Sequence, residues 1–457
     1  MTVLVPGSTR SPVSGPESAP EAPVRRLWDR ALLRLSVFGA ATVCAALLGW
    51  FRLPSAARDT VWAEDGRLFL VGAEQHGLFG AAFLPYAGYL QFVPRLIAGA
   101  VVQVLPASQW ALGMTAGACL AAGMIACVVF VASRDVLASR IVRAVLASVV
   151  VLIPLGPRDV LGTPTNLHSI LMWMLFWLLL FSPRSRRSAT AMSMIGLVAA
   201  LSEIQAVFLV PLLIPAARRR HGWLLVAGPA IGMAAQLVVT ALAPRSLPSA
   251  PQDSPLSIAE GYLINAVVSN ALPQSLVGPF VANGGLAGAI VVLALLAGLL
   301  AIAWGHTTAR QRLGILAATA LSTLIWTASV VDNPASFYDY ATLTHSEAMH
   351  LWLTRYGVVP AMLLFGAALL AADALLRAGG PRFRRALAIV TILCVATCLT
   401  INYMPTWTRR SSGPSWSQQI PAAQDACADA PDLRTVALHE TLGWQVPVLC
   451  RYLHDAE

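Results

Sequence analysis

The sequence predicts an all-α membrane protein with many transmembrane helices. Of its 457 residues, 57% are hydrophobic and only 12% are charged, and the mean hydropathy is +0.68. The apolar runs are continuous, as in membrane helices, and lack the alternating pattern of β-barrel strands. The run at 35–51, LSVFGAATVCAALLGWF, is the first of many that approach the ~20 residues a helix needs to cross a bilayer.

The basic residues of this chain are all arginines, because the sequence contains no lysine. The net charge of +9 comes from short arginine clusters between apolar runs, a pattern typical of cytoplasmic loops rather than of a nucleic-acid-binding surface. The absence of lysine excludes Schiff-base and Walker-type chemistry. Residues 1–30 are rich in Pro, Ser and Ala without an early apolar segment, which predicts a disordered cytoplasmic tail and no cleaved signal peptide.

The arginine clusters predict a topology of about eleven spans, with a cytoplasmic N-terminus and an external C-terminus, in the plasma membrane. The clusters placed on the cytoplasmic side are 25–34, 134–143, 184–187, 218–220, 310–312 and 377–385. The spans are then 35–51, 110–133, 144–156, 167–182, 189–202, 205–217, 222–243, 284–304, 313–331, 355–376 and 386–404.

One further apolar segment, 89–106, carries Pro94 and Arg95 in its middle. If it crossed the membrane, every later arginine cluster would face the wrong side. We therefore expect a helix that lies in the outer interface. The chain then divides into the cytoplasmic tail 1–30, a transmembrane domain 31–404 whose first external loop is 52–109, and an external C-terminal cap 405–457.

Cysteine positions predict one structural disulfide. Five of the seven cysteines lie within predicted spans, where the thiol acts as a small buried hydrophobic group. Cys427 and Cys450 lie in the cap, where an oxidising compartment allows them to pair. We expect this cap to contain one helix and a short pair of strands, and to be too small for an independent domain.

The stretch TVWAEDGRLFL, 60–70, places Glu64 and Asp65 at the mouth of the first external loop. Charged side chains at a membrane face are solvated, paired or functional, because their desolvation is costly. Asp65 followed by Gly66 also fits an ordinary solvated turn. The residues alone leave both interpretations open.

The arrangement as a whole resembles the GT-C superfamily of integral-membrane glycosyltransferases. The likeness lies in the cytoplasmic N-terminus, the long first external loop that opens with an acidic motif, and the long late external loop. Asp65 with Phe69 four residues later matches the spacing of the family motif, whereas Glu64 does not. The segment 85–96, PYAGYLQFVPRL, resembles the interfacial segment that follows this motif.

This resemblance implies transfer of a sugar from a polyprenyl-phosphate donor to an envelope glycan, lipid or protein on the outer face. Asp65 is expected to be the general base of an inverting reaction, with Glu64 as its orienting partner. If the reaction uses a divalent cation, Mg²⁺ or Mn²⁺, the same two carboxylates are its candidate ligands.

Other residues of the outer face are candidates for substrate binding. Arginine suits the phosphate of the donor, because it binds phosphate oxygens in a bidentate manner. The candidate phosphate ligands are Arg355, Tyr356, Arg95 and Arg67, with Arg158 as a further possibility. The candidates for contact with the sugar or the acceptor are Tyr86, Tyr89, Asn166, His168, Glu203, Gln205 and His345.

The sequence also bears on alternative functions. The histidines lack the spacing of a zinc site, and no phosphate-binding loop is present, so a nucleotide-sugar donor is not expected. A transporter or a flippase for lipid-linked sugars is the main alternative, with Glu203 as a coupling site at membrane depth. A membrane scaffold is a third. Membrane lipids are expected partners in every case, and nucleic acid is not.

Overall fold

The computed structural model describes residues 22–245, 253–404 and 408–454, and it is mostly helical (76%). Seven helices of the described residues are long and apolar enough to cross a membrane, and each overlaps one predicted span. They are Ala107–Asp135, Arg140–Asp159, Gly222–Leu242, Leu286–Trp304, Ala309–Val331, Arg355–Ala378 and Arg382–Ile401. The prediction of a helical membrane protein with several spans is therefore confirmed.

The other four predicted spans fall on α1 (Ala22–Phe51) and on three short helices, α8 (Leu167–Leu180), α9 (Arg186–Ala200) and α10 (Val210–Ala217). At 1.5 Å per residue these three helices measure only ~12–23 Å, less than the ~30 Å of a bilayer core. The count of eleven spans is therefore not established.

Helix α1 begins at Ala22, so residues 22–30 are helical although the sequence analysis expected them to be disordered. The rest of that expected tail, residues 1–21, lies outside the described residues. The chain forms two compact units, Met1–Ala41 and Thr42–Glu457, and α1 crosses the boundary between them. The larger unit holds every other helix and strand, the C-terminal cap included.

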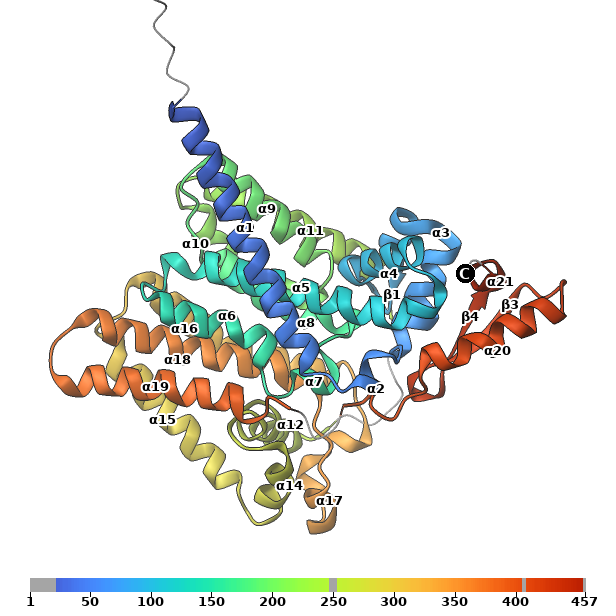
Figure 1. Cartoon of the computed structure of the whole chain (residues 1–457). Coiled ribbons are helices and arrows are strands. Elements are labelled where there is room, and N and C mark those ends of the chain that lie inside the picture. The colour runs from blue at the N-terminus through green and yellow to red at the C-terminus, as the bar shows by residue number, and fades with distance from the viewer. Residues whose placement is uncertain (1–21, 246–252, 405–407, 455–457) are drawn as a thin grey trace, which may run out of the picture. The chain divides into compact units, whose positions relative to one another are not determined.

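Two helices, α8 and α18 (Val358–Ala378), are buried along nearly their whole length. They pack closely because Gly366 of α18 has no side chain, and an added Cβ there would lie 2.9–3.0 Å from the rings of Trp173 and Trp177. Around them pack α5 (Trp110–Ala132), α6 (Arg140–Leu152), α15 (Leu286–Trp304), α16 (Ala309–Val331) and α19 (Arg382–Ile401) (Figure 1). Helix α11 (Gly222–Leu242) packs on α9.

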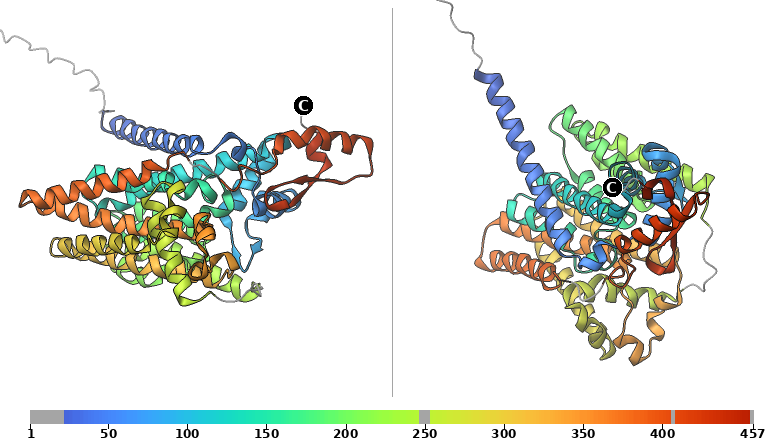
Figure 2. Two further views of the ribbon diagram at one scale, coloured as in Figure 1. Left: turned by 90° about the horizontal axis from the view of Figure 1, so that it is seen from below. Right: turned by 45° about the vertical axis from the view of Figure 1, so that its right-hand side comes forward.

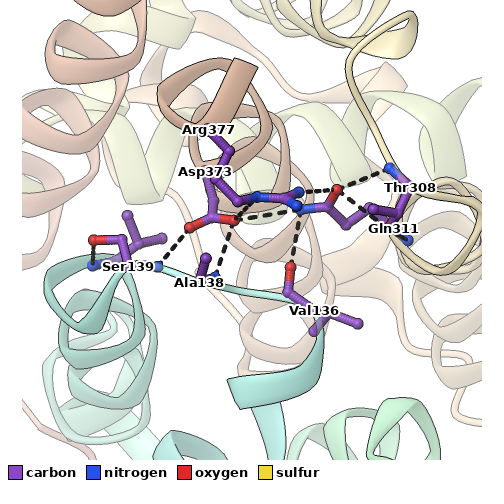
Figure 3. Close-up of polar contacts among 8 residues, drawn as sticks. Val136, Ala138, Ser139, Thr308, Gln311, Asp373 and Arg377 are labelled. Carbon is purple, nitrogen blue, oxygen red and sulfur yellow. Dashed lines mark hydrogen bonds and ion pairs between the residues drawn. The ribbon is translucent and has the colours of Figure 1, made fainter. Parts of the chain in front are cut away.

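A buried carboxylate ties three of these helices together at one end (Figure 3). Asp373 of α18 is 0% exposed and accepts hydrogen bonds from the backbone N–H groups of Ala138 and Ser139, at the start of α6. It also pairs with Arg377 at 3.0 Å and accepts from Gln311 of α16. A buried charge needs this number of partners, because its desolvation costs several kcal/mol.

The same end of the bundle collects the predicted cytoplasmic arginines. Asp135 accepts a hydrogen bond from the backbone N–H of Ser182, which joins the segments around Arg134 and Arg184. Arg219 donates to the carbonyl groups of Leu179 and Phe181 at 2.7 and 2.9 Å. With the contacts of Arg377, these bonds bring five of the predicted clusters to one end of the bundle.

The first external loop contains short elements rather than a span. These are α2 (Ser55–Arg58), η1 (Asp65–Leu70), α3 (Val71–Ala82), the hairpin of β1 (Pro85–Tyr86) and β2 (Tyr89–Leu90), α4 (Phe92–Val104) and η2 (Ala107–Gln109). Helix α4 is only ~20 Å long and packs on α3. The segment 89–106 is thus too short a helix to cross a bilayer, as the arginine argument required.

The C-terminal cap packs on this loop, so segments far apart in the sequence lie side by side (Figures 1 and 2). The cap consists of α20 (Trp416–Asp429), the antiparallel strands β3 (Thr435–His439) and β4 (Gln445–Leu449), η10 (Thr441–Gly443) and α21 (Cys450–His454). Trp416 stacks on Trp110 at 6.3 Å. The disulfide Cys427–Cys450 is present, which confirms that prediction.

The remaining elements are short helices between the long ones. They are η3 (Ser133–Asp135), α7 (Gly156–Asp159), η4 (Pro164–Asn166), η5 (Ile204–Leu209), α12 (Pro255–Tyr262), η6 (Leu263–Val268), α13 (Ser269–Ala271), α14 (Gln274–Ala282), η7 (Ser336–Tyr338), η8 (Tyr340–Thr342), α17 (His345–Met349) and η9 (Arg355–Gly357). Several of them carry candidate site residues.

Candidate functional site

The acidic motif lies at the end of the bundle opposite to Asp373. Arg355 stands at one end of the helix that contains Asp373, ~27 Å away along its axis. Asp159, which pairs with Arg355, follows the end of α6 whose start is bound by Asp373. The candidate site is therefore built at the end away from the arginine clusters.

Asp65 is held by one residue of a neighbouring loop. Its carboxylate is 1% exposed, and Oδ1 accepts hydrogen bonds from both the backbone N–H and the hydroxyl of Thr165, at 2.7 and 2.6 Å. The motif itself is wound tightly, because the N–H groups of Asp65 and Gly66 both donate to the carbonyl of Trp62 before the π-helix η1 begins. Asp65 is a buried, anchored carboxylate rather than the solvated turn that the sequence also allowed.

Burial raises the pKa of Asp65 to about 7, against the opposing effect of the two Thr165 hydrogen bonds. The neighbouring Glu64 raises it further, and Arg410 lowers it. A carboxylate with a pKa near the working pH can both accept and release a proton, which is the property a general base needs.

Glu64 points toward the β1–β2 hairpin, where it accepts a hydrogen bond from the hydroxyl of Tyr86 at 3.3 Å. Burial first, and then Glu64, raise the pKa of Tyr86 to about 12, so this hydroxyl remains a donor. The hairpin turn has a left-handed backbone at Ala87 and Gly88 (φ 49° and 85°), which matches the twist of a two-residue hairpin. Phe69 packs edge-on against Tyr86 at 6.3 Å.

A polar cavity of about 120 Å³ lies beside this hairpin. Six of the predicted site residues line it: Tyr89, His168, Glu203, Gln205, Arg355 and Tyr356. They come from the first loop, from α8, from the turn between α9 and α10, and from the entry to α18. The sequence analysis assigned them to donor and sugar binding, and the structure brings them together.

Arg355 is fixed by a shared carboxylate. Its Nη1 lies 3.1 Å from Oδ2 of Asp159, which is also 3.4 Å from Nη1 of Arg409 in the C-terminal segment. Asn166 donates to Oδ1 and to the backbone carbonyl of Asp159, and thus orients this carboxylate instead of lining the cavity. One carboxylate between two arginines leaves the cluster with net positive charge, which favours an anionic ligand such as phosphate.

A histidine–carboxylate pair faces the same cavity. Nδ1 of His168 is bonded to Oε2 of Glu203, and Oε1 of Glu203 accepts from the backbone N–H of Gln205 at 2.7 Å. The side chain of Gln205 is in turn held by Ser329 at 2.9 Å. Glu203 is only 3% exposed, so its partner explains how a carboxylate is tolerated at this depth.

Three predicted residues lie elsewhere. The Arg95 guanidinium is stacked over Phe69 at 4.8 Å and is 3% exposed, so it supports the packing of the first loop. Arg67 is exposed and lies over the Trp444 ring at 5.5 Å. His345 is exposed and contacts the carbonyl of Ala282. The structure therefore does not bring these three to the polar cavity. Arg158, the further candidate, lies over the Trp352 ring at 5.8 Å.

The C-terminal cap contributes a carboxyl that the sequence analysis missed. Glu440 is 1% exposed, and its Oε1 accepts a hydrogen bond from the backbone N–H of Arg67 at 3.3 Å. Burial raises its pKa to about 9, and the nearby carboxylates of Asp65 and Glu64 add to that shift. Glu440 is therefore protonated at neutral pH. The one signal for Glu440 in the sequence was that it falls in the cap, which was predicted to lie on the same side of the membrane as the acidic motif.

The acidic motif does not form a metal-binding set in this structure. Among the described residues, no group of three or more His, Cys, Asp or Glu side chains is arranged to hold a metal ion. Oδ1 of Asp65 and Oε1 of Glu64 accept hydrogen bonds from different partners, Thr165 and Tyr86. The two carboxylates are thus oriented by different neighbours, which does not fit the shared coordination expected of them, and we derive no step through a metal.

The fold and the site define a multi-helix membrane protein with a carboxylate- and arginine-lined site at one end. Comparison with protein-family models, with curated proteins and with solved structures found no match.

Proposed function

We propose that this protein is a membrane glycosyltransferase that uses a polyprenyl-phosphate sugar as donor. It transfers the sugar to an envelope glycan, lipid or protein. The observation that carries this proposal is the polar cavity in which Arg355 and Tyr356 lie beside the hairpin that binds Glu64. A cationic group for a phosphate and carboxylates for an attacking hydroxyl are the two requirements of this chemistry.

Arg355 is the residue that binds the donor phosphate. Its Nη1 is committed to Asp159, while its buried Nε has no hydrogen-bond partner among the described residues. A buried donor without a partner costs ~1–3 kcal/mol, so a phosphate oxygen that accepts this hydrogen bond is stabilised. Tyr89 and the His168–Glu203 pair supply polar groups for the sugar hydroxyls in the same cavity.

Asp65 is the proposed base. Its Oδ1 is held by Thr165, which leaves Oδ2 to take the proton of the acceptor hydroxyl. The hydroxyl oxygen forms a bond to the anomeric carbon, the bond from that carbon to the phosphate oxygen breaks, and the phosphate leaves with the electron pair. Attack from the face opposite to the leaving group inverts the anomeric centre. The negative charge of Glu64 stabilises the oxocarbenium-like transition state.

The test replaces Asp65 with Asn in the full-length protein and measures envelope glycans together with lipid-linked sugar. Loss of a general base lowers rates ~10²–10⁴-fold, so the glycan product falls and the donor accumulates. Asp429→Asn, the same change at an exposed cap residue, is the control. Glu64→Gln costs less than Asp65→Asn.

Two results contradict the proposal. Unchanged glycans with stable Asp65→Asn protein remove the enzymatic role. If lipid-linked sugar accumulates on the cytoplasmic leaflet with the Asp65→Asn protein, while transfer on the outer leaflet remains intact, the protein is a flippase instead.

A further inference from the structure

A second ligand space lies on the other side of the acidic motif, under the C-terminal cap. This groove of about 400 Å³ is lined by Trp352 and by residues 409, 412–414, 439–441 and 443 of the cap. We propose that this groove is a binding site for a neutral, hydroxyl-rich carbohydrate chain, and that it holds the acceptor. The second half of the proposal rests on the proposed function.

The groove offers hydrogen-bonding groups around one arginine, Arg409, which shares the Asp159 carboxylate with Arg355. The Arg409 guanidinium lies 4.4 Å over the Trp352 ring and 3.4 Å from the Asp159 carboxylate. Its buried Nε has no hydrogen-bond partner among the described residues, so a ligand hydroxyl can accept that hydrogen bond. The hydroxyl of Ser412 is exposed at the rim.

Glu440 adds no negative charge to the groove at neutral pH, because its raised pKa of about 9 keeps it protonated. The groups that face this carboxyl are Asp65, Glu64 and Arg67 from the first loop. Among its described lining residues, the groove therefore holds one arginine that is already bound to Asp159, and no ionised carboxylate. A neutral ligand that donates and accepts many hydrogen bonds matches such a surface better than a phosphate or a polyacid does.

The inner wall of the groove also holds the acidic motif. Thr441 accepts a hydrogen bond from the N–H of Ala63 and donates to the carbonyl of Val61, both at 3.1 Å. Glu440 binds the backbone of Arg67. These bonds fix both ends of the segment that contains Glu64 and Asp65, so a ligand in the groove lies against the turn that positions the motif.

The two ligand spaces are linked by one carboxylate. Asp159 pairs with Arg355 in the polar cavity and with Arg409 in the groove. In an inverting transfer the acceptor hydroxyl attacks the anomeric carbon of the donor from the face opposite to the leaving phosphate, so donor and acceptor need separate binding spaces. In the cavity, Arg355 offers its unpartnered Nε to the anionic donor, and in the groove the bound Arg409 and the hydroxyl of Ser412 suit an uncharged acceptor.

The experiment measures binding without depending on activity. Saturation-transfer NMR is recorded on the full-length protein in nanodiscs, with gluco-, galacto-, manno- and arabino-tetrasaccharides as neutral probes and a uronic-acid tetrasaccharide as an anionic probe. Ser412→Trp fills the groove from an exposed position, and Gln418→Trp introduces the same side chain at an exposed position of α20 outside the groove.

We expect at least one neutral tetrasaccharide to bind, Ser412→Trp to weaken that binding tenfold or more, and Gln418→Trp to leave it unchanged. Binding of no neutral probe, equal binding to Ser412→Trp, or binding of the uronic-acid probe alone overturns the proposal. Hydrogen exchange of α20 and β4 in both variants checks that the cap stays folded.

The acceptor role is tested separately by donor turnover. Ser412→Trp is expected to abolish transfer to glycan while slow cleavage of the donor by water continues. If tetrasaccharides bind in the groove but Asp65→Asn leaves envelope glycans unchanged, the carbohydrate site stands and the glycosyltransferase function falls. If donor cleavage also stops in Ser412→Trp, the groove does not act as a separate acceptor site.

Discussion

Gly66→Ala is the sharpest structural test of how the C-terminal cap and the acidic motif depend on each other. A Cβ at this position would lie 2.0 Å from Oε2 of Glu440 and 2.6 Å from Cγ2 of Val446. Carbon atoms in contact prefer separations of ~3.5–4.0 Å, so the cap must move by roughly 1 Å or more. The Glu440 carboxyl can rotate only by breaking its bond to Arg67, and Val446 is fully buried in the cap core.

Overpacking of this kind costs ~1–3 kcal/mol. Residue 66 has a helical backbone in η1, which alanine adopts as readily as glycine. We therefore assign the cost to the docking of the cap. The ratio of docked to undocked cap then falls ~5–150-fold. Hydrogen exchange of the β3–β4 peptides in nanodiscs accelerates by the same factor, and transfer activity falls with it.

Gly298→Ala is the matched control, because an added Cβ there meets no atom within 4 Å. It should leave exchange of the cap unchanged. The combination of Gly66→Ala with Glu440→Ala removes the closest contact and should recover part of the protection. Wild-type exchange across β3 and β4 in the Gly66→Ala variant would contradict this prediction, since the cap would then tolerate the added carbon.

Three further predictions concern charge and the disulfide. Thr165→Val removes a hydrogen bond that lowers the pKa of Asp65. The pH at which activity rises, expected near 7, should therefore move to a higher value in a profile of activity against pH. If this pH does not change, another group is responsible for the rise. The pKa of Glu440 is raised to about 9 in the docked cap, from an ordinary value of 4.5. The docked cap therefore binds more protons than the undocked cap, and docking weakens as the pH rises from 4.5 to 9. Glu440→Gln should remove this slope, measured as protease sensitivity of the cap at pH 6 and pH 9; an equal slope in the variant contradicts the assignment. Cys427→Ser opens a loop with a sequence separation of 23, which costs up to ~3.4 kcal/mol by loop entropy and should raise hydrogen exchange in the cap alone.

The sequence predicted the helices that are strongly apolar and long, because hydropathy and length carry that information locally. Its count of spans is not established where apolar runs are short. The runs at 167–182, 189–202 and 205–217 form helices α8, α9 and α10, and α8 is buried by protein on all sides. A continuous apolar run does not distinguish a lipid-facing helix from one surrounded by other helices.

The sequence predicted which polar residues lie at the outer end of the helices. It predicted only in part which of them lie next to one another. Six of those residues share the cavity, because each stands at an element boundary on the predicted outer end. Arg95 and Arg67 have the right chemistry and the right side, but stacking on Phe69 and Trp444 occupies them. Glu440 could not be assigned from the sequence, since its contact depends on how the cap docks.

The hydrogen bond between Arg67 and Glu440 spans 373 residues. At ~5–20 residues per second, synthesis of the chain takes roughly 20–75 s to reach Glu440 after it has passed Arg67. During that interval the acidic motif has no cap to hold it, while the seven membrane-length helices of the described residues are being made. The contact between the cap and the acidic motif therefore forms only after the last long helix, Arg382–Ile401, has been made. A chain whose cap does not dock leaves the motif without its contacts to Glu440 and Thr441, so the geometry of the motif depends on the part of the chain that is made last.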